Sequence, residues 1–244
     1  MGIHLAGLTS LPEVREGDDL AELIRQAAAR ERQPLGAGSI AVIAQKIVSK
    51  AEGAVVDLRT VEPSERARQW AGQWGKDARL IELILRESRR IVKMERGVLI
   101  AETRHGFVTA NAGVDLSNVP GPDRASVLPR DPDGSARRIR SALGCGAVII
   151  SDTFGRPWRE GLTNVAIGVS GMEALEDYRG LPDRNGRVLE STVIAVADEL
   201  AAAAGLLMRK TEGVPVVLVT GLVWKRAEGS AGPLIRPAER DLFR

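Results

Sequence analysis

Three continuous apolar runs limit most strongly what this chain can fold into. Residues 38–49 (GSIAVIAQKIVS), 147–151 (AVIIS) and 214–222 (VPVVLVTGL) are typical of strands buried inside a sheet. Helical patterns separate these runs without a strict alternation, and the strongest of them is the Ala- and Leu-rich stretch 191–210. The sequence therefore predicts mixed helices and strands built around buried strands.

Weaker patterns predict the remaining helices. Residues 17–32 place apolar side chains at helical spacing, and residues 131–144 are expected to form a short helix with Ser135 as its N-cap. Residues 63–92 carry a longer helical pattern, which Gly75 is expected to divide into two helices because glycine weakens a helix interior. These helices would cover the buried strands.

Two loops are the candidate domain boundaries. One lies near Gly75, and the other is LPDRNGRV at 181–188, whose Asn-Gly pair is a turn signal. We expect a discontinuous nucleotide-binding domain over 1–75 plus 188–244, and a second domain over 76–187. The second domain would contain two short strands around a turn within 97–115, and would carry the candidate metal aspartates.

Composition excludes several classes of function. Lys and Arg number 34 against 32 Asp and Glu, and the net charge of +2 with only 3% aromatic residues argues against a nucleic-acid partner. No apolar run reaches the roughly 18 residues of a membrane-spanning helix, so no membrane partner is expected. The single cysteine, Cys145, rules out an intramolecular disulfide framework and a Cys-based zinc site, and suits a cytoplasmic location.

Polar clusters that directly follow apolar runs are the candidates for chemistry. Asp152 and Thr153 follow the run 147–151, and Asp115 lies in the turn-rich stretch TANAGVDLSN. Two carboxylates and a hydroxyl are hard oxygen donors, which suit Mg²⁺ or Mn²⁺ better than zinc. The alternative interpretation is that Asp152 and Thr153 only cap the loop after a strand.

Basic residues near the same strands indicate a polyanionic ligand. Lys46 and Lys50 lie at the end of the run 38–49, and Arg156 and Arg159 follow Asp152 closely. Lysines can hold phosphate as point charges, and arginines can clamp it in bidentate fashion. Neither G-x-x-x-x-G-K-S/T nor G-x-G-x-x-G occurs, so a nucleotide would need a different phosphate site. The alternative is that these side chains form a solvated edge.

Six stretches follow one another along nearly the whole chain to Leu222: GLTSLPEVREGDDL, AQKIVSKAEGAVVDL, NAGVDLSNV, LPRDPDGSARRIR, AVIISDTFGRPWREGLTNVAIGVSGM and ADELAAAAGLLMRKTEGVPVVLVTGL. In this order and at these separations they resemble the coenzyme F420:L-glutamate ligase family. The resemblance implies an α+β protein of two domains, with mixed and antiparallel sheets and flanking helices, that forms an intertwined homodimer. It also implies a ligase that uses GTP and Mg²⁺ or Mn²⁺ to add L-glutamate to the deazaflavin coenzyme F420-0, and in many members further γ-linked glutamates.

The resemblance also assigns roles to single positions. It implies that Asp115 and Asp152 ligate a first metal and that Thr153 helps to hold a second. It implies a guanine-nucleotide site formed by Leu11, Pro12, Glu13, Val14, Gln45, Lys50 and Asn118. Gln45 departs from the small hydroxyl residue usual in the family, which leaves its contact open.

Lys210 is a second departure from the family. It stands where relatives carry a glutamine that reaches the second metal. A protonated ammonium has no lone pair and cannot ligate a metal. Lys210 is therefore expected to supply positive charge beside the phosphates; otherwise it points to solvent and the alignment is shifted by a residue or two.

These assignments suggest one mechanism and leave two other function classes open. GTP would activate the coenzyme's carboxylate as an acyl phosphate, with Lys50 neutralising phosphate charge and Arg156 and Arg159 stabilising the transferring group. The two arginines could instead hold the acidic tail of the substrate. The other classes are a metal-dependent phosphohydrolase that uses the same aspartates, and a non-catalytic binder of the deazaflavin or of a guanine nucleotide.

Overall fold

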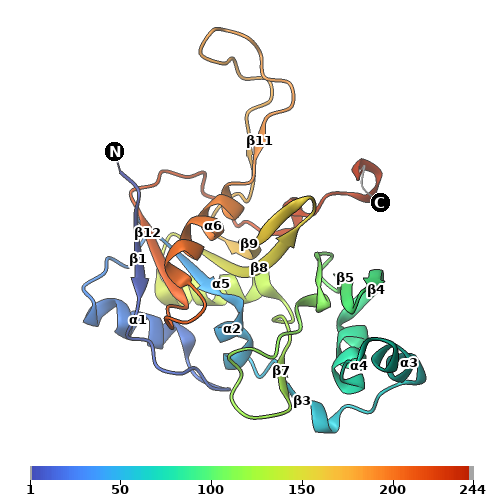
Figure 1. The fold of residues 1–244 in the computed structure, drawn as a ribbon. Coiled ribbons are helices and arrows are strands. Elements are labelled where there is room, and N and C mark those ends of the chain that lie inside the picture. The colour runs from blue at the N-terminus through green and yellow to red at the C-terminus, as the bar shows by residue number, and fades with distance from the viewer. Residues whose placement is uncertain (1, 242–244) are drawn as a thin grey trace.

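The computed structural model describes residues 2–241, which fold around a five-stranded mixed sheet (Figure 1). The strands lie in the order β1 (His4–Leu8), β12 (Val216–Thr220), β2 (Ser39–Ala44), β8 (Ala147–Arg156) and β9 (Arg159–Ser170). Only the β2–β8 pair is parallel, and the other three pairs are antiparallel. The three apolar runs thus supply the three central strands of the sheet, as predicted.

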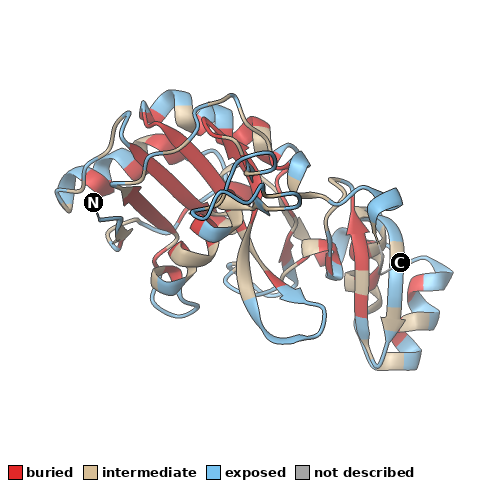
Figure 2. Ribbon diagram, turned by 90° about the horizontal axis from the view of Figure 1, so that it is seen from above, coloured by how far each residue is buried: buried red, intermediate tan, exposed pale blue. Residues whose placement is uncertain are grey.

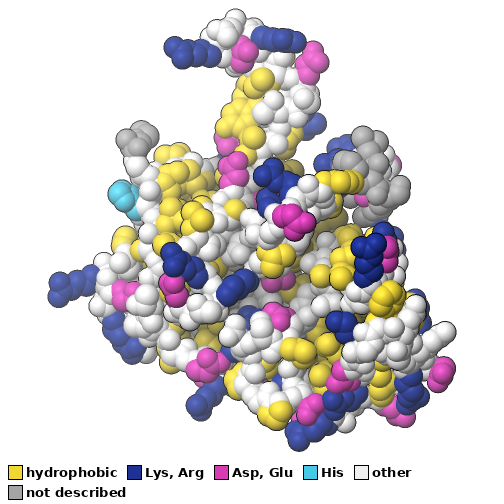
Figure 3. All heavy atoms as spheres, in the orientation of Figure 1, with side chains coloured by type: hydrophobic (Ala, Val, Ile, Leu, Met, Phe, Trp, Pro, Cys, Tyr) yellow, Lys and Arg dark blue, Asp and Glu magenta, His cyan; other side chains and the backbone are white. Residues whose placement is uncertain are grey.

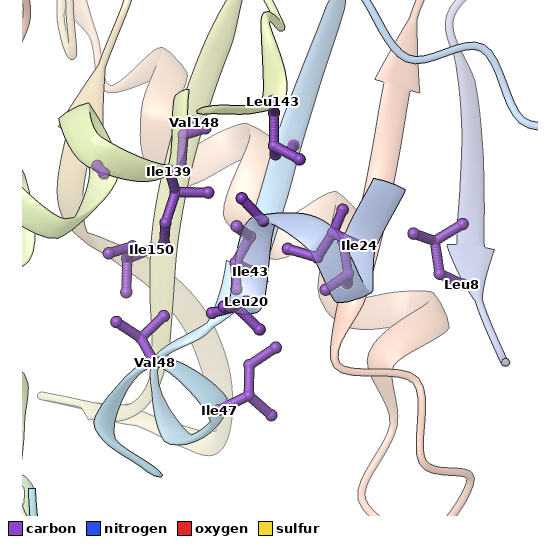
Figure 4. Close-up of a cluster of buried hydrophobic side chains, with 14 of the residues drawn as sticks. Leu8, Leu20, Ile24, Ile43, Ile47, Val48, Ile139, Leu143, Val148 and Ile150 are labelled. Atoms are coloured by element: carbon purple, nitrogen blue, oxygen red, sulfur yellow. The ribbon is translucent and has the colours of Figure 1, made fainter. Parts of the chain in front are cut away.

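Helices cover both faces of this sheet, so alternate strand residues enter two separate cores. On one face α1 (Leu20–Arg30), α2 (Gln45–Ala51) and α5 (Pro132–Leu143) pack with Ile43 and Ile150, and Figure 4 shows this cluster. On the other face α6 (Val196–Met208) packs with Val42 and Ile149. Figure 2 shows the result: the middle strands of the sheet, such as β2 and β12, are buried along most of their length and many of the surrounding turns are exposed.

A smaller group of elements lies beside the central sheet. It contains α3 (Glu65–Trp74), α4 (Ala78–Glu87) and the antiparallel strands β4 (Ser88–Glu95), β5 (Val98–Thr103) and β6 (Val108–Ala110), with their own apolar core. The antiparallel pair β3 (Val55–Asp57) and β7 (Arg124–Ser126) lies next to it, and four short 3-10 turns complete the chain at Leu58–Thr60, Asn111–Gly113, Gly232–Leu234 and Ala238–Arg240. The α+β class with mixed and antiparallel sheets and flanking helices is confirmed.

A narrow arm projects from the body. It begins with the antiparallel pair β10 (Glu176–Asp177) and β11 (Val193–Ile194), and the loop between them stands away from the rest of the chain at the top of Figure 1. The apolar side chains of Leu181, Val188 and Val193 on this arm are exposed. We call residues 176–194 the arm below.

Four details of the predicted elements are wrong. The strand predicted over 38–49 ends at Ala44, because Gln45, Ile47 and Val48 bury one face of helix α2. The helix predicted to residue 92 ends at Glu87, and the chain continues as β4 paired with β5. The N-cap of α5 is Asp131, whose carboxylate accepts from the amide of Gly134.

The predicted N-cap residue of α5 and the predicted start of α6 account for the third and fourth errors. Ser135, predicted as the N-cap of α5, is buried inside the helix and donates to Glu52. The helix predicted from residue 191 begins only at Val196, because residues 193–194 belong to the arm's strand pair. Gly75 does end α3, as predicted, in a left-handed conformation with φ of 63°.

The central sheet also bears on the predicted domain division. β8 and β9 fall within the predicted second domain, yet β8 pairs with β2 of the predicted first domain, and β9 joins the same sheet by pairing with β8. The division at 76 and 187 stays a prediction. Within residues 2–241, none of the helices combines the length and apolar character needed to cross a bilayer.

Candidate active site

A cavity of about 670 Å³ lies where β2 passes into α2, and it faces the middle of the β8–β9 hairpin and the end of α6. The loop after β6 and the loop 209–215 complete its wall. Its polar lining residues are Glu13, Gln45, Lys46, Lys50, Asp115, Ser117, Asn118, Ser151, Asp152, Thr153, Asn164, Arg209, Lys210 and Thr211. On the face shown in Figure 3, acidic and basic side chains are interspersed, without a continuous area of one sign.

Asp152 and Thr153 lie within strand β8 rather than in a loop after it, opposite Val165 and Asn164 of β9. Burial, helped by the nearby negative charge of Asp115, raises the pKa of the Asp152 carboxyl to about 6. The backbone amide of Thr153 and the charges of Lys210 and Lys46 oppose this rise. The two carboxylates are thus close enough to repel each other, which a shared cation would relieve.

Asp115 is held by the turn that follows it and by a lysine from α2. The backbone amide of Ser117 donates to Oδ1 over 2.8 Å, and Lys46 Nζ donates to Oδ2 over 2.7 Å. Burial by itself would raise the pKa of Asp115, but these hydrogen bonds and the lysine charge lower it below its ordinary value. Asp115 is therefore ionised near neutral pH.

Lys50 is the buried cation of the site. It is 7% exposed, and its Nζ donates to Oε1 of the exposed Glu13. Gln45, one turn earlier in α2, is also buried and accepts a hydrogen bond of 2.9 Å from Ser49. Gln45 is the first residue of α2 and Lys50 lies in its last turn, and because this short helix begins directly at the end of β2, both side chains line the cavity.

Lys210 points into the cavity and not away from it. Its Nζ donates to the hydroxyl of Thr153 over 2.7 Å, and its charge acts on Asp152. Arg209 directly before it has φ of 37° and ψ of −178°, a backbone region that non-glycine residues rarely adopt. The chain therefore turns sharply at the end of α6, and this turn brings Lys210 to the cavity.

The donor set fits a hard divalent cation. Two carboxylates and a hydroxyl, with water or phosphate oxygens as further ligands, are the partial coordination that Mg²⁺ commonly accepts. Among residues 2–241 no cluster of three or more His, Cys, Asp or Glu side chains is present, so a zinc-type site of protein ligands alone is not built there.

The structure separates some of the residues predicted to act together. Arg156 and Arg159 flank the exposed turn of the β8–β9 hairpin, outside the cavity wall, and Arg156 donates to the backbone of Glu160. Of Leu11, Pro12, Glu13 and Val14, only Glu13 lines the cavity. Leu11 and Val14 pack into the apolar core beneath it, and Pro12 is exposed.

Sequence reasoning missed several residues of the cavity wall. Ser117 had a local signal, since an Asp followed two residues later by a donor amide is a common turn. Asn164 and Met208 had none, because their positions depend on the register of β8 with β9 and on the packing of α6. Lys46, Lys50, Asp115, Asn118, Asp152, Thr153 and Lys210 all line the one cavity.

Comparison with known proteins identifies the family of this chain. A family model described as F420-0:Gamma-glutamyl ligase matches residues 9–221. Similar proteins include one from Methanothermobacter thermautotrophicus, 50% identical over 100% of both chains, and one from Methanopyrus kandleri, 48% identical over 95% of this chain and 94% of the relative. A third, from Methanocaldococcus jannaschii, is 42% identical over 99% and 97% of the two chains, and all three are named coenzyme F420:L-glutamate ligase. The chain thus belongs to the F420-0:gamma-glutamyl ligase family, as its sequence resemblance predicts.

Proposed function

We propose that this chain is a ligase that joins the amino group of L-glutamate to the carboxylate of coenzyme F420-0, with GTP as the activating co-substrate. One observation carries the proposal: in a member of this family, a single cavity gathers Asp115, Asp152 and Thr153 with the ammonium groups of Lys46, Lys50 and Lys210. Carboxylates that can hold a cation, surrounded by fixed positive charge, suit the transfer of a phosphoryl group.

The proposed reaction has two steps. A carboxylate oxygen of F420-0 bonds to the γ-phosphorus of GTP as the bond to the bridging oxygen breaks, which gives an acyl phosphate and GDP. The glutamate amine then attacks the acyl carbon, the bond to phosphate breaks, and an amide, inorganic phosphate and a proton are formed. Further γ-linked additions would repeat these steps on the new glutamate.

The chain's own residues bind and neutralise the phosphates. Asp115, Asp152 and Thr153 would hold Mg²⁺ or Mn²⁺, which when bound neutralises phosphate oxygens. The buried Lys50 is suited to carry the largest effect, because its charge is poorly screened by water. Lys210 adds a second cation beside Thr153.

The remaining predicted residues take roles that suit their places. Gln45 and Asn118 line the cavity and, with Glu13, would contact the guanine nucleotide. Leu11, Pro12 and Val14 would shape the segment that carries Glu13.

The two arginines of the β8–β9 hairpin are placed to contact the substrate and not the transferring phosphate. Arg156 and Arg159 are exposed and outside the cavity, which favours a contact with the acidic tail of the substrate over a clamp on the transferring phosphate.

Mass spectrometry tests the reaction. After incubation of the chain with F420-0, GTP, L-glutamate and Mn²⁺, we expect the deazaflavin to gain one or more glutamyl residues, with one GDP formed for each. Phosphate release that is independent of glutamate would instead indicate a phosphohydrolase. Tight nucleotide or deazaflavin binding without any turnover would indicate a binding protein.

We also propose that the chain forms the intertwined homodimer that its family resemblance implies. The arm supports this, because it exposes Leu181, Val188 and Val193 away from the body. Sedimentation should give twice the chain mass of 26.2 kDa at micromolar concentration. Replacing the three apolar side chains with serine should shift the mass toward the monomer, whereas serine at Leu206 of α6, which is more exposed than any of the three, should not. A wild-type monomer would contradict the proposal.

A further inference from the structure

Asn164 lies at the junction of strand β9, helix α6 and the cavity wall. It pairs with Thr153 across the β8–β9 hairpin, and the Asn164 and Thr153 side chains share the face that lines the cavity. Its amide contacts both the Thr153 hydroxyl and the sulfur of Met208 in the last turn of α6. Asn164 was not among the candidate site residues.

Met208 fixes which way the Asn164 amide points. Asn164 Nδ2 lies 3.4 Å from the Met208 sulfur. A thioether sulfur has no hydrogen to donate and can only accept, so the amide nitrogen belongs on that side. The amide oxygen, Oδ1, must then face Thr153, from whose Oγ1 it is separated by 3.1 Å.

The orientation of the Thr153 hydroxyl follows from this. An amide oxygen is an acceptor only, so Thr153 must donate its single hydrogen to Asn164. The lone pairs of Oγ1 are left for the cavity, where the Lys210 ammonium donates to this oxygen over 2.7 Å. Without Asn164 the hydroxyl would be free to rotate and to turn its hydrogen toward a cation.

Gly205 of helix α6 leaves room for the Asn164 side chain. A Cβ atom added at Gly205 would lie 3.0 Å from Cγ of Asn164 and 3.3 Å from its amide oxygen and nitrogen. Such contacts are tighter than side chains normally make. A glycine inside a helix costs about 1 kcal/mol relative to alanine. The close approach of α6 to Asn164 gives a reason for this glycine.

We propose that Asn164 is a positioning residue that orients the Thr153 hydroxyl with its oxygen lone pairs facing the cavity, so that this oxygen can serve a divalent cation or the Lys210 ammonium. The proposal rests on the proposed function, in which Thr153 is a metal ligand. Asn164 itself does not touch the metal. The hydroxyl oxygen has two lone pairs, so one can accept from Lys210 and the other can bind a cation.

A double-mutant cycle on Mn²⁺ affinity tests the proposal. Free Mn²⁺ is measured by electron paramagnetic resonance as it is titrated into the full-length chain. Asn164→Leu should weaken Mn²⁺ binding roughly 10- to 100-fold, the usual effect of removing the partner of a metal ligand. In a Thr153→Val background the same change should have no further effect, because the hydroxyl it orients is gone.

Two variants serve as comparisons. Asn164→Asp keeps an acceptor oxygen beside Thr153 and should retain Mn²⁺ affinity at least equal to that of the wild type, although it loses the donor to Met208. Thr163→Val changes the preceding residue of β9, which lies outside the cavity wall, and this variant should bind Mn²⁺ as the wild type does. If Asn164→Leu does not fold, Asn164→Ala takes its place in the cycle.

The outcomes separate this inference from the proposed function. Equal losses of Mn²⁺ affinity from Asn164→Leu in both backgrounds, or equal losses in the Leu and Asp variants, would overturn the positioning role even if the wild type makes glutamylated product. A coupled cycle in a chain that makes no such product would support the positioning role and overturn the ligase. A wild type that binds no Mn²⁺ would overturn both.

Discussion

Replacing Asp152 with asparagine is expected to lower the rate of glutamyl transfer at least about 100-fold. Removing a residue that only hydrogen-bonds to a metal ligand lowers metal affinity or activity about 10- to 100-fold, and loss of a ligand should cost at least as much. The change removes one of two negative charges that face the proposed cation. It should not destabilise the fold, because burial and the charge of Asp115 already disfavour the ionised form and raise the pKa of Asp152 to about 6.

The measurement pairs a product assay with thermal unfolding. Asp115→Asn should lose activity similarly but also stability, because Lys46 and Ser117 bond to that carboxylate. Asp57→Asn, in β3 and outside the cavity, is the matched control and should keep wild-type turnover. Near-normal turnover of Asp152→Asn would show that the reaction does not need the Asp152 carboxylate as a cation ligand.

Gly168→Ala is expected to destabilise the chain by more than about 3 kcal/mol, above the usual range for an overpacked core. A Cβ at this position in β9 would lie 2.5 Å from the carbonyl oxygen and 2.6 Å from the carbonyl carbon of Pro132, the first residue of α5. This backbone has little freedom to move aside, because Asp133 next to it accepts hydrogen bonds from the amides of Val169 and Ala231.

Urea unfolding of two glycine variants measures the effect. Gly155→Ala, on the neighbouring strand β8, is the matched control because its Cβ would meet only the Leu162 side chain, at 3.8 Å. We expect the Gly155 variant to unfold close to the wild-type midpoint and the Gly168 variant far below it. Equal midpoints would show that the start of α5 can shift away from β9.

Three of the five strands of the central sheet, β2, β8 and β12, could be predicted because continuous apolar runs are a local signal, whereas β1 and β9 were not predicted. Element boundaries could not: Ile47 and Val48 continue the apolar run of β2, and only their burial on one face of α2 shows that the strand has ended. Similarly, Ser135 resembles an N-cap in sequence, yet its hydroxyl bonds to Glu52, 83 residues away. Long-range packing decides such cases.

The same distinction between local signals and long-range packing applies to the residues of the candidate site. Aspartates and lysines could be singled out because their chemistry is visible in one sequence. The ion pair of Lys46 with Asp115 and the contact of Lys210 with Thr153 join residues far apart in the chain, which no local pattern encodes. Arg156 and Arg159 follow Asp152 closely in sequence, but the turn of the hairpin carries them out of the cavity wall.

The parallel pairing of β2 with β8 has a consequence for folding kinetics. About one hundred residues separate these neighbouring strands along the chain. Closing a loop of that length costs conformational entropy before the stabilising contacts between the two strands form. The pairing of β2 with β8 therefore belongs to the slow steps of folding. Lys46 and Lys50 follow β2 directly, and Asp152 lies on β8. The cations and the carboxylate therefore meet only after that closure, and recovered activity during refolding reports the completed sheet rather than any early intermediate.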